Sequence, residues 1–385
     1  MQNGMIKVIT GVRRCGKTYL LFRLFAEYLR RELGVDDEHI IEIALDTEDA
    51  TAYRDPGVLN DYLKSRLLDK TSQYHVLIDE VQYAITGQEL KGTAAPRLYG
   101  VLNGLLRSHN VDVYVTGSNS KMLSTDVLTE FRGRGDEVRV RPLSFAEYMS
   151  GFDGDRYGGW AEYVLYGGMP LVLSMRSDQQ KSLYLERLFA ETYLKDIIAR
   201  NGIEKTQELG DLVNVLASSV GSLVNPSRIE ATFKSVLKSK LSANTIASYI
   251  GYLEDVGLRN ARLNFRQVEE NHLMENIIYN ELRLRGFSVD VGCVEKQARQ
   301  DGKVIRKNLE VDFVANLGSR RCYLQSAWRI PDSEKERQEK APLIEVPDSF
   351  KKILLVRDTV KPTYDQHGIL TMSVLDFLLN PNSLD

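Results

Sequence analysis

The chain has 385 residues, of which 43% are hydrophobic and 27% are charged, and 50 basic against 53 acidic side chains give a net charge of −3. This composition is ordinary for a globular protein and excludes a disordered chain, a collagen-like chain and a basic coat for nucleic acid. The length predicts two or three domains, since a domain usually holds about 100–150 residues.

Short β-rich runs alternate with helical segments in the first part of the chain, and this alternation predicts a parallel sheet flanked by helices. Between the runs lie amphipathic stretches such as Tyr19–Glu32, whose apolar residues recur at helical spacing. The glycine-rich stretch Gly151–Gly159 then interrupts the pattern, and Tyr166–Pro170 is a second break. The predicted strands are Met5–Thr10, His39–Leu45, Tyr74–Asp79, Asp112–Thr116 and Glu137–Arg141.

The remainder of the chain is predicted to be a helical module followed by a mixed tail. From Gln179 to about Gly257 the pattern is helical, with helices expected at Leu209–Val220, Pro226–Ser239 and Ala243–Leu253. The elements predicted for the tail are the helix Glu269–Arg285 and the strands Leu309–Ala315, Arg321–Ser326 and Lys352–Val356. Three domains follow from this pattern, at residues 1–170, 171–260 and 261–385.

The segment Gly11–Thr18 (GVRRCGKT) fits the pattern G-x-x-x-x-G-K-[ST], and it lies between an apolar strand and a helix. Glycines permit the close approach of backbone amides to phosphate oxygens, and the following helix adds its positive end. Lys17 would reach the β- and γ-phosphates, and the Thr18 hydroxyl would ligate Mg²⁺. A glycine turn that matches by chance is the alternative, which the flanking strand and helix disfavour. The predicted ATP-binding residues are Gly11, Val12, Arg13, Arg14, Cys15, Gly16, Lys17, Thr18 and Tyr19.

Two adjacent carboxylates, Asp79 and Glu80, end the apolar run that begins at His75. At the carboxyl end of a parallel strand they would face the same crevice as the phosphate loop. We expect Asp79 to hold Mg²⁺ and Glu80 to be the catalytic base that deprotonates the attacking water. A solvated strand end is the alternative, and the upstream Gly-Lys-Thr loop favours the catalytic pair.

Polar and basic residues follow the next strand. Asn119 is a candidate sensor of the γ-phosphate, although a Gly-Ser-Asn turn that caps a helix has the same composition. Arg132 or Arg134, on the glycine-flanked segment Phe131–Gly135, is a candidate for the guanidinium that neutralises the transferring phosphoryl group. A surface turn with a solvated arginine is an equal alternative.

Together these segments resemble AAA-superfamily ATPases of bacteria and archaea that carry a C-terminal domain of nuclease-like fold, a group related to the STAND NTPases. The resemblance covers nearly the whole chain, and its markers are Thr10–Leu21, Leu77–Gln82, Thr116–Leu123, Gly133-Arg134, Arg141–Tyr148 and Tyr166–Pro170. It implies an α/β fold: a P-loop NTPase domain with a parallel sheet, an all-α helix-turn-helix-like domain and a small α+β nuclease-like domain. It also implies ATP hydrolysis, with Asn119 as the sensor and Arg134 as the arginine element.

The helical module contains a candidate helix-turn-helix unit for DNA. Asn244, Thr245 and Ser248 would lie on the exposed face of its last helix, with lysines nearby. Tri-helical units also serve as protein-docking pieces and ATPase lids, and the segment has no dense basic stripe, so both alternatives stay open.

The tail resembles the PD-(D/E)XK nuclease core, with Glu275 or Glu281 on a helix and Asp312 in the metal position. Gln325 is a weaker candidate oxygen ligand, and Ala327 stands where the family has a lysine. A metal-dependent nuclease needs that cation to stabilise the attacking hydroxide. We therefore expect a degenerate domain that serves binding or structure.

Three widely spaced cysteines, Cys15, Cys293 and Cys322, form neither a disulfide framework nor a metal knuckle and favour a reducing compartment. Cys15 in the phosphate loop suggests a redox switch, but a small side chain that fits the loop is the preferred interpretation. No apolar run approaches the roughly 20 residues of a membrane span, and the first residues show no signal sequence. We expect a cytoplasmic protein with no membrane partner.

The leading hypothesis is an Mg²⁺-dependent ATPase that acts as a molecular switch or small motor, with nucleic acid a candidate substrate. The alternative is an ATP-gated DNA-binding regulator with slow or incidental hydrolysis. DNA, through the helical and C-terminal domains, and a second copy of the chain are the candidate macromolecular partners, because an arginine acting in trans requires an oligomer.

Overall fold

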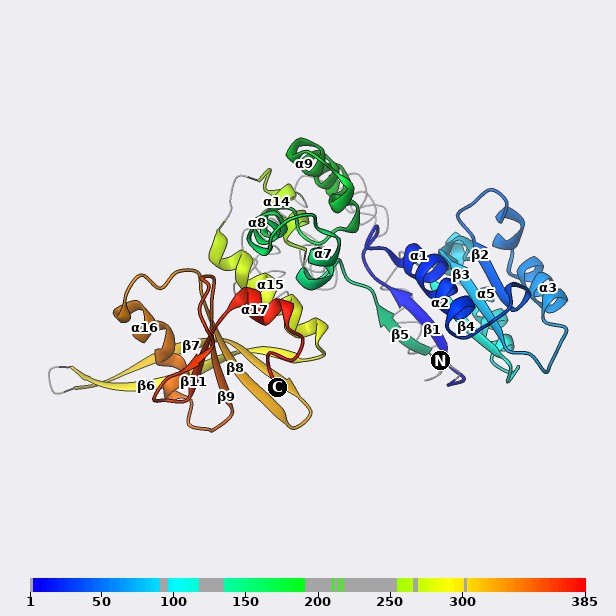
Figure 1. Cartoon of the computed structure of the whole chain (residues 1–385). Helices are drawn as coiled ribbons and strands as arrows, with labels where there is room; N and C mark the ends of the chain where they lie inside the picture. Colours follow the sequence, from blue (N-terminus) through cyan, green and yellow to red (C-terminus); the bar gives the residue numbers. More distant parts are fainter. Residues whose placement is uncertain are drawn as a thin grey trace. The chain divides into compact units, whose positions relative to one another are not determined.

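The computed structural model describes residues 3–90, 96–117, 135–190, 210, 214, 217, 255–265, 269–300 and 303–385 (Figure 1). The chain divides into two compact units, Met1–Pro142 and Leu143–Asp385. The first unit ends before the predicted domain end at residue 170, because helices α7 (Phe145–Gly151) and α8 (Arg156–Tyr166) pack into the core of the second. The helices predicted between 209 and 253 fall almost entirely outside the described residues, so the three-domain division stays a prediction.

The N-terminal unit is built on a five-stranded sheet with the strand order β2-β3-β4-β1-β5, and all neighbouring strands are parallel. The parallel α/β architecture predicted from the sequence is thus confirmed. The strands are β1 (Ile6–Thr10), β2 (Ile40–Ala44), β3 (Tyr74–Asp79), β4 (Val111–Thr116) and β5 (Gly135–Arg139).

Helices cover both faces of this sheet. Leu77 packs with α2 (Ala26–Arg31), while its neighbours along β3 pack on the opposite face with α3 (Pro56–Arg66) and α5 (Arg97–Leu105). This alternation follows from the strand geometry, in which successive side chains point to opposite faces. The shorter helical segments of the unit are α1 (Lys17–Tyr19), the π-helix η1 (Leu20–Phe25), η2 (Asp37–His39), η3 (Thr51–Arg54), η4 (Val81–Ala84) and α4 (Gly87–Leu90).

The C-terminal unit contains a six-stranded mixed sheet with the order β10-β11-β9-β8-β7-β6. The pairs β8–β9 and β9–β11 are parallel, and the remaining pairs are antiparallel. The strands are β6 (Ser288–Gln300), β7 (Lys303–Leu317), β8 (Arg320–Ala327), β9 (Lys351–Val356), β10 (Thr363–Tyr364) and β11 (Ile369–Ser373). Its further helices are η5 (Pro170–Ser174), α9 (Asp178–Arg187), α14 (Val256–Arg262), α15 (Glu270–Leu284), α16 (Ser333–Glu345) and α17 (Val374–Leu379).

Two hydrophobic clusters lie on the two faces of this second sheet. The larger cluster joins Trp160 of α8 with residues of α15, α17 and the central strands. The smaller one joins Leu343 of α16 with the alternate residues of the same strands. Residues far apart in the sequence, such as Tyr163 and Phe377, therefore share one core.

The break predicted at Gly151–Gly159 is only partly present. Gly158 and Gly159 lie inside α8, whose first turn is capped by the Asp155 carboxylate, which accepts hydrogen bonds from the backbone N–H groups of Tyr157 and Gly158 at 2.8 Å each. Such a cap satisfies the donors that a helix start leaves unpaired. A helix therefore begins within the stretch predicted to interrupt the pattern.

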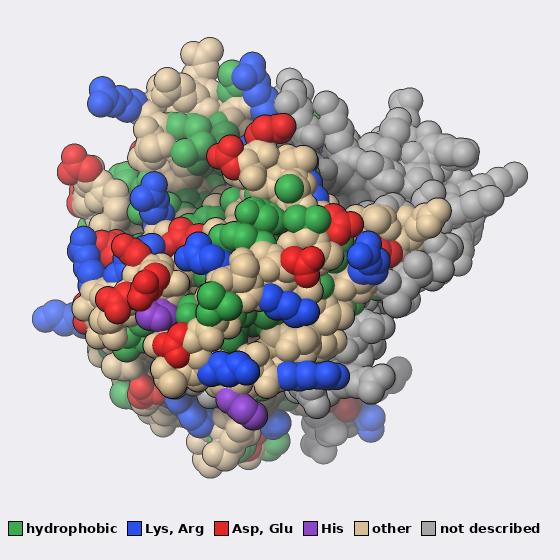
Figure 2. Space-filling model, turned by 90° about the vertical axis from the view of Figure 1, so that its right-hand side faces the viewer, with side chains coloured by type: hydrophobic (Ala, Val, Ile, Leu, Met, Phe, Trp, Pro, Cys, Tyr) green, Lys and Arg blue, Asp and Glu red, His purple; other side chains and the backbone are tan. Residues whose placement is uncertain are grey.

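Charged side chains of both signs are mixed across the face of the molecule in Figure 2, with hydrophobic side chains between them. This mixing agrees with the near balance of acidic and basic residues. Among the described helices, none combines the length and the apolar character that a bilayer crossing requires.

Candidate functional site

Three strand ends meet at the carboxyl edge of the N-terminal sheet. Strand β4 lies between β3 and β1, so Thr116 at its end is paired with Ile9 of β1 on one side and lies beside Asp79, the last residue of β3, on the other. Crevices outside the carboxyl ends of parallel strands are where open α/β sheets bind ligands. The predicted phosphate loop and acidic pair therefore lie on one edge of the sheet.

The loop after β1 has a backbone shape that requires glycine at two places. Gly11 has φ +147°, and a Cβ at this position would collide with the backbone carbonyl oxygen of Val140. Gly16 has φ 104° and stands at the N-terminus of α1. Non-glycine residues rarely adopt such angles. The two glycines of the predicted motif thus carry the conformation of the loop, and helix α1 begins at Lys17.

Lys17 is held against the loop that precedes it. Its side chain is buried, with an exposed fraction of 5%, and its Nζ donates hydrogen bonds to the carbonyl oxygens of Gly11 at 3.1 Å and Val12 at 3.2 Å. A buried ammonium held by neutral carbonyls keeps a positive charge inside the loop, and this charge would attract an anionic ligand.

A chain of hydrogen bonds joins the loop to the acidic strand end. Thr18 Oγ1 donates to Asp79 Oδ2 at 2.7 Å, and Thr116 Oγ1 donates to Asp79 Oδ1. Burial raises the pKa of Asp79, whose exposed fraction is 1%, while the bonds from the two threonines oppose that shift. Thr18 and Asp79 therefore meet as predicted, and Thr116 is a further member of the site.

Glu80 follows Asp79 in an unusual backbone conformation. Its φ is 54°, in the left-handed region, and its backbone N–H donates to Thr116 Oγ1 at 3.2 Å. Its carboxylate accepts a hydrogen bond from the side-chain amide of Gln82. Strained backbone of this kind persists where the surrounding structure fixes it, and it is frequent at functional sites.

The donor set suits a magnesium–nucleotide complex. The Thr18 hydroxyl and the Asp79 carboxylate supply hard oxygen ligands of the type that Mg²⁺ prefers. The carbonyl oxygen of Val140 fills the space that a Cβ would occupy at Gly11, and the carbonyl oxygens of Gly11 and Val12 hold the buried ammonium of Lys17 inside the loop. The residues present thus fit the predicted ATP and Mg²⁺.

Some predicted residues fall outside the described part of the chain. Asn119, Arg132 and Arg134 lie within 118–134, so their roles stay predictions. The sequence reasoning missed two hydroxyl contacts, that of Thr116 and that of Thr10, whose Oγ1 donates to Glu137 Oε1 at 2.7 Å. In the sequence, Thr10 and Thr116 could have been singled out because each is the last residue of a predicted strand.

Cys15 is buried in the loop, and its Sγ lies 3.5 Å from the carbonyl oxygen of Val140. Burial raises the pKa of the thiol, although the charge of Lys17 opposes the shift. A raised pKa disfavours the reactive thiolate. The contact agrees with the interpretation of Cys15 as a small side chain that fits the loop.

A second acidic site lies in the C-terminal unit, in a pocket of about 320 Å³ lined by Glu275 of α15, Asp312 of β7 and Lys335 of α16. Burial raises the pKa of Glu275 to about 7, assisted by the negative charge of Asp312, and burial raises the pKa of Asp312 to about 6. Of the two glutamates proposed from the sequence, Glu275 is the one in this pocket, whereas Glu281 pairs with Arg285 at 2.7 Å.

Both carboxylate oxygens of Asp312 already accept hydrogen bonds. The side-chain amide of Gln325 donates to Oδ1 at 2.7 Å, and the backbone N–H and hydroxyl of Ser326 each donate to Oδ2 at 2.8 Å. Gln325 thus presents its amide nitrogen to the Asp312 carboxylate, while its Oε1 accepts from the backbone N–H of Asp312 at 3.3 Å. This arrangement fits the prediction of a domain that does not cleave efficiently, and the nuclease likeness itself stays a prediction.

Two family models match segments of the chain. Residues 3–149 match a family described as an AAA domain, and residues 158–271 match a domain of unknown function. Among solved structures, C. elegans PCH-2 is similar with 14% identity and a TM-score of 0.30, and the match covers 65% of this chain and 60% of that one.

Two curated relatives extend over most of the chain. An uncharacterized protein of Methanocaldococcus jannaschii is 26% identical over 376 residues, which cover 87% of this chain and 77% of the relative. An uncharacterized protein of Haemophilus influenzae is 30% identical over 407 residues, which cover 97% of this chain and 94% of the relative. The chain carries an AAA-type P-loop ATPase domain and belongs to the same family as the Haemophilus influenzae protein.

Proposed function

We propose that the chain binds ATP together with Mg²⁺ and hydrolyses it, as a molecular switch or small motor. The observation that carries the proposal is the 2.7 Å hydrogen bond between the Thr18 hydroxyl and Asp79, next to the buried ammonium of Lys17. It brings a phosphate-binding loop and an acidic strand end, which are 61 residues apart, to one place.

Each residue then has a role that its position supports. Lys17 would bind the β- and γ-phosphates, and Thr18 and Asp79 would hold Mg²⁺, which when bound neutralises charge on the phosphate oxygens. Glu80 would accept the proton of the attacking water. Asn119 remains the proposed sensor, and Arg134 the proposed arginine, supplied in an oligomer by a second copy of the chain.

The alternative function, an ATP-gated DNA-binding regulator, has one observation in its favour. The Glu80 carboxylate accepts a hydrogen bond from Gln82, and a base engaged in this way must exchange that partner before it can take a proton from water. Slow hydrolysis would then accompany ATP binding.

One experiment separates these functions: release of phosphate from ATP and binding of ATP, each measured with and without duplex DNA. We expect Lys17→Ala to lose both, and Glu80→Gln to lose about 100-fold or more in turnover while it keeps its affinity for ATP. Lys64→Ala and Glu48→Gln, on exposed positions of the same unit, are the matched controls and should behave as the wild type.

Unchanged turnover in Glu80→Gln would remove the assignment of the base. ATP binding without measurable turnover in the wild type, with DNA affinity that falls steeply as salt rises, would favour the regulator. A large stimulation of turnover by DNA would support a motor or switch that acts on nucleic acid.

A further inference from the structure

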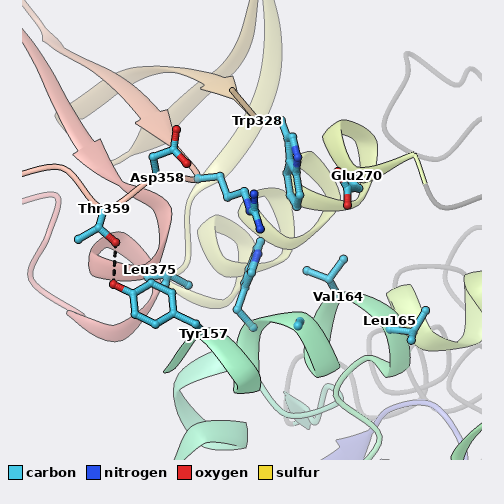
Figure 3. Close-up of a pocket in the computed structure, with 11 residues that line it drawn as sticks. Tyr157, Val164, Leu165, Glu270, Trp328, Asp358, Thr359 and Leu375 are labelled. Carbon is cyan, nitrogen blue, oxygen red and sulfur yellow. Dashed lines mark hydrogen bonds between the residues drawn. The ribbon is translucent and has the colours of Figure 1, made fainter. Parts of the chain in front are cut away.

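The C-terminal unit has a pocket of about 390 Å³ at the carboxyl ends of its parallel strands (Figure 3). Trp328 directly follows β8 and Arg357 directly follows β9, and the last residues of these two strands, Ala327 and Val356, are paired. Leu375, just after β11, lines the same pocket. This is the place at which sheets with parallel strands commonly bind ligands.

Helix α8 forms the opposite wall of the pocket. In Figure 3, Trp328 extends from its strand end toward the side where Val164 and Leu165 of α8 lie. Tyr157, at the start of the same helix, lies at the rim, where its hydroxyl and Thr359 Oγ1 form a hydrogen bond of 2.7 Å. The pocket is therefore enclosed by elements that belong to one compact unit.

Two indole N–H donors in the walls of this pocket have no acceptor. Trp160, with an exposed fraction of 5%, and the half-buried Trp328 each have a buried Nε1 that finds no hydrogen-bond partner among the residues the structure describes. A buried donor without a partner costs about 1–3 kcal/mol, and buried tryptophans usually find one. A ligand that carries hydrogen-bond acceptor atoms would satisfy these two donors.

The guanidinium of Arg357 adds further hydrogen-bond donors to those of the two indoles. Arg357 lies over the ring of Trp328, with its Cζ 4.8 Å from the ring centroid, and within the described residues its side chain makes no ion pair. Two exposed carboxylates, Glu270 and Asp358, also line the pocket. One positive charge against two negative charges disfavours a free anion such as phosphate as the occupant.

We propose that this pocket binds an unpaired nucleobase of a single-stranded nucleic acid. A base is planar and neutral, so it can stack on the indole of Trp328 without meeting charge repulsion from Glu270 and Asp358. Its carbonyl oxygens or unprotonated ring nitrogens accept from the indole N–H groups and from Arg357, and the two carboxylates accept from its ring N–H or amino groups. Thymine and uracil supply two carbonyl oxygens and one ring N–H for these bonds. A purely hydrocarbon ligand would leave all these donors unsatisfied.

The residue after Trp328 lies where a bound single-stranded nucleic acid would extend beyond the pocket. Arg329 is exposed and lines the neighbouring acidic pocket, together with Trp328, which lines both. A base in the first pocket would thus bring its phosphate toward the Arg329 guanidinium, and arginine is well suited to phosphate oxygens. A base within a duplex is paired and stacked, so it cannot enter without being extruded.

Trp160 and Trp328 are the only tryptophans of the chain, which makes intrinsic fluorescence a direct probe of this pocket. The full-length protein, without ATP, is titrated with short oligo(dT), with oligo(rU), with an abasic oligonucleotide of equal length and with duplex DNA. We expect saturable quenching of tryptophan fluorescence by one or both of the single strands that carry bases. The dT and rU arms identify DNA or RNA as the source of the base.

Variants are tested in parallel through the anisotropy of a labelled oligonucleotide. Trp328→Leu should weaken binding about 5- to 100-fold, while Trp328→Phe, which keeps a ring, should lose less. Arg357→Gln should weaken binding about fivefold or more. The matched controls are Tyr364→Leu, an exposed ring on β10, and Arg337→Gln, an exposed arginine on α16; both should bind as the wild type.

Three results would overturn the proposal. They are equal binding and quenching by the abasic strand, preference for the duplex over every single strand, and wild-type affinity in Trp328→Leu with native circular dichroism. Absence of any quenching would do the same. Because no ATP is present, the outcome does not depend on whether the N-terminal unit hydrolyses nucleotide.

Discussion

Thr116 joins the two acidic residues of the nucleotide site. Its hydroxyl donates to Asp79 Oδ1 and accepts from the backbone N–H of Glu80 at 3.2 Å. Because a single fully buried hydroxyl makes both bonds, it fixes the carboxylate proposed to hold Mg²⁺ and the peptide on which the proposed base stands. Thr116 is thus a positioning residue, which acts through Asp79 and Glu80.

Thr116→Val keeps the shape of the side chain and removes its hydroxyl. Loss of a hydrogen bond to a charged group costs about 1.5–3 kcal/mol, so we expect kcat for ATP hydrolysis to fall about 10- to 100-fold. The KM for ATP should change by less than about threefold, since the loop proposed to bind the phosphates is left intact.

Thr116→Ser is the matched variant, because it restores the hydroxyl without the methyl group. It should recover most of the lost kcat, as measured by steady-state phosphate release. If Ser and Val were equally impaired, or if KM rose as much as kcat fell, the hydroxyl would not be the positioning group.

The loop and the acidic strand end of the candidate nucleotide site could be predicted from the sequence, whereas for Thr116 the sequence shows only its place at the end of a strand. The spacing of Gly11, Gly16 and Lys17 encodes a loop whose backbone needs glycine, and that need is local. The role of Thr116 depends on β4 lying between β3 and β1, a neighbourhood that the order of strands along the chain does not reveal.

At the scale of the element, the strands of the N-terminal sheet were predicted well, whereas the charged helix α16 and the apolar elements β11 and α17 of the tail were missed. Helix α16 (Ser333–Glu345) is rich in charged residues, contains Pro342 and has Leu343 as its apolar residue in the core cluster, so it has no broad apolar stripe to recognise. Helix α8 was interpreted as a break because Gly158 and Gly159 lie within it, yet tertiary packing overrides the low propensity of glycine.

Helix α14 packs unusually closely against the end of α8. A Cβ on Gly257 would collide with the backbone carbonyl oxygen of Tyr166 and lie 2.9 Å from the backbone nitrogen of Gly167. Neither backbone atom can move as a flexible side chain would. We therefore expect Gly257→Ala to lower the free energy of unfolding by about 3 kcal/mol, measured by urea unfolding with tryptophan fluorescence.

Gly158→Ala is the control for this helix pair, since its Cβ would have Asp155 Oδ1 at 3.6 Å as its nearest neighbour, an ordinary contact. Alanine is the better helix former, so this variant should gain about 0.5–1 kcal/mol. Equal effects of the two substitutions would mean that helix propensity, and not the close approach of α14, governs both positions.

At the scale of the whole molecule, each compact unit has its own hydrophobic core. The compact units divide after Pro142, whereas the predicted first domain ends at residue 170, because α8 joins a core with α15 and α17, more than 100 residues later in the chain. Contacts over such separations leave no periodic trace in the sequence. Both tryptophans lie in the second unit, so their fluorescence follows its unfolding.

Buried carboxyl groups with raised pKa values are concentrated in the second unit. Burial raises the pKa of Asp255 and of Asp312 to about 6 and that of Glu275 to about 7. A raised pKa means that the folded state binds these protons more tightly than the unfolded chain does. The stability that they contribute is therefore present at low pH and is lost as the pH rises through 6 and 7.

Glu275→Gln tests this linkage, because glutamine keeps the shape of the side chain and is neutral at every pH. Glu275 is 22% exposed and faces Asp312 and Glu310, whose charges raise its pKa, and His272, whose hydrogen bond at 3.2 Å opposes the shift. Near pH 8 the variant should be more stable than the wild type by about 1–3 kcal/mol, and near pH 5 the two should be nearly equal.

Urea unfolding followed by tryptophan fluorescence measures both stabilities, with Glu334→Gln on the exposed face of α16 as the control that should leave the pH dependence unchanged. A fall in stability from about pH 5 to pH 8 that is as steep in Glu275→Gln as in the wild type would assign the dependence to Asp255 and Asp312 instead.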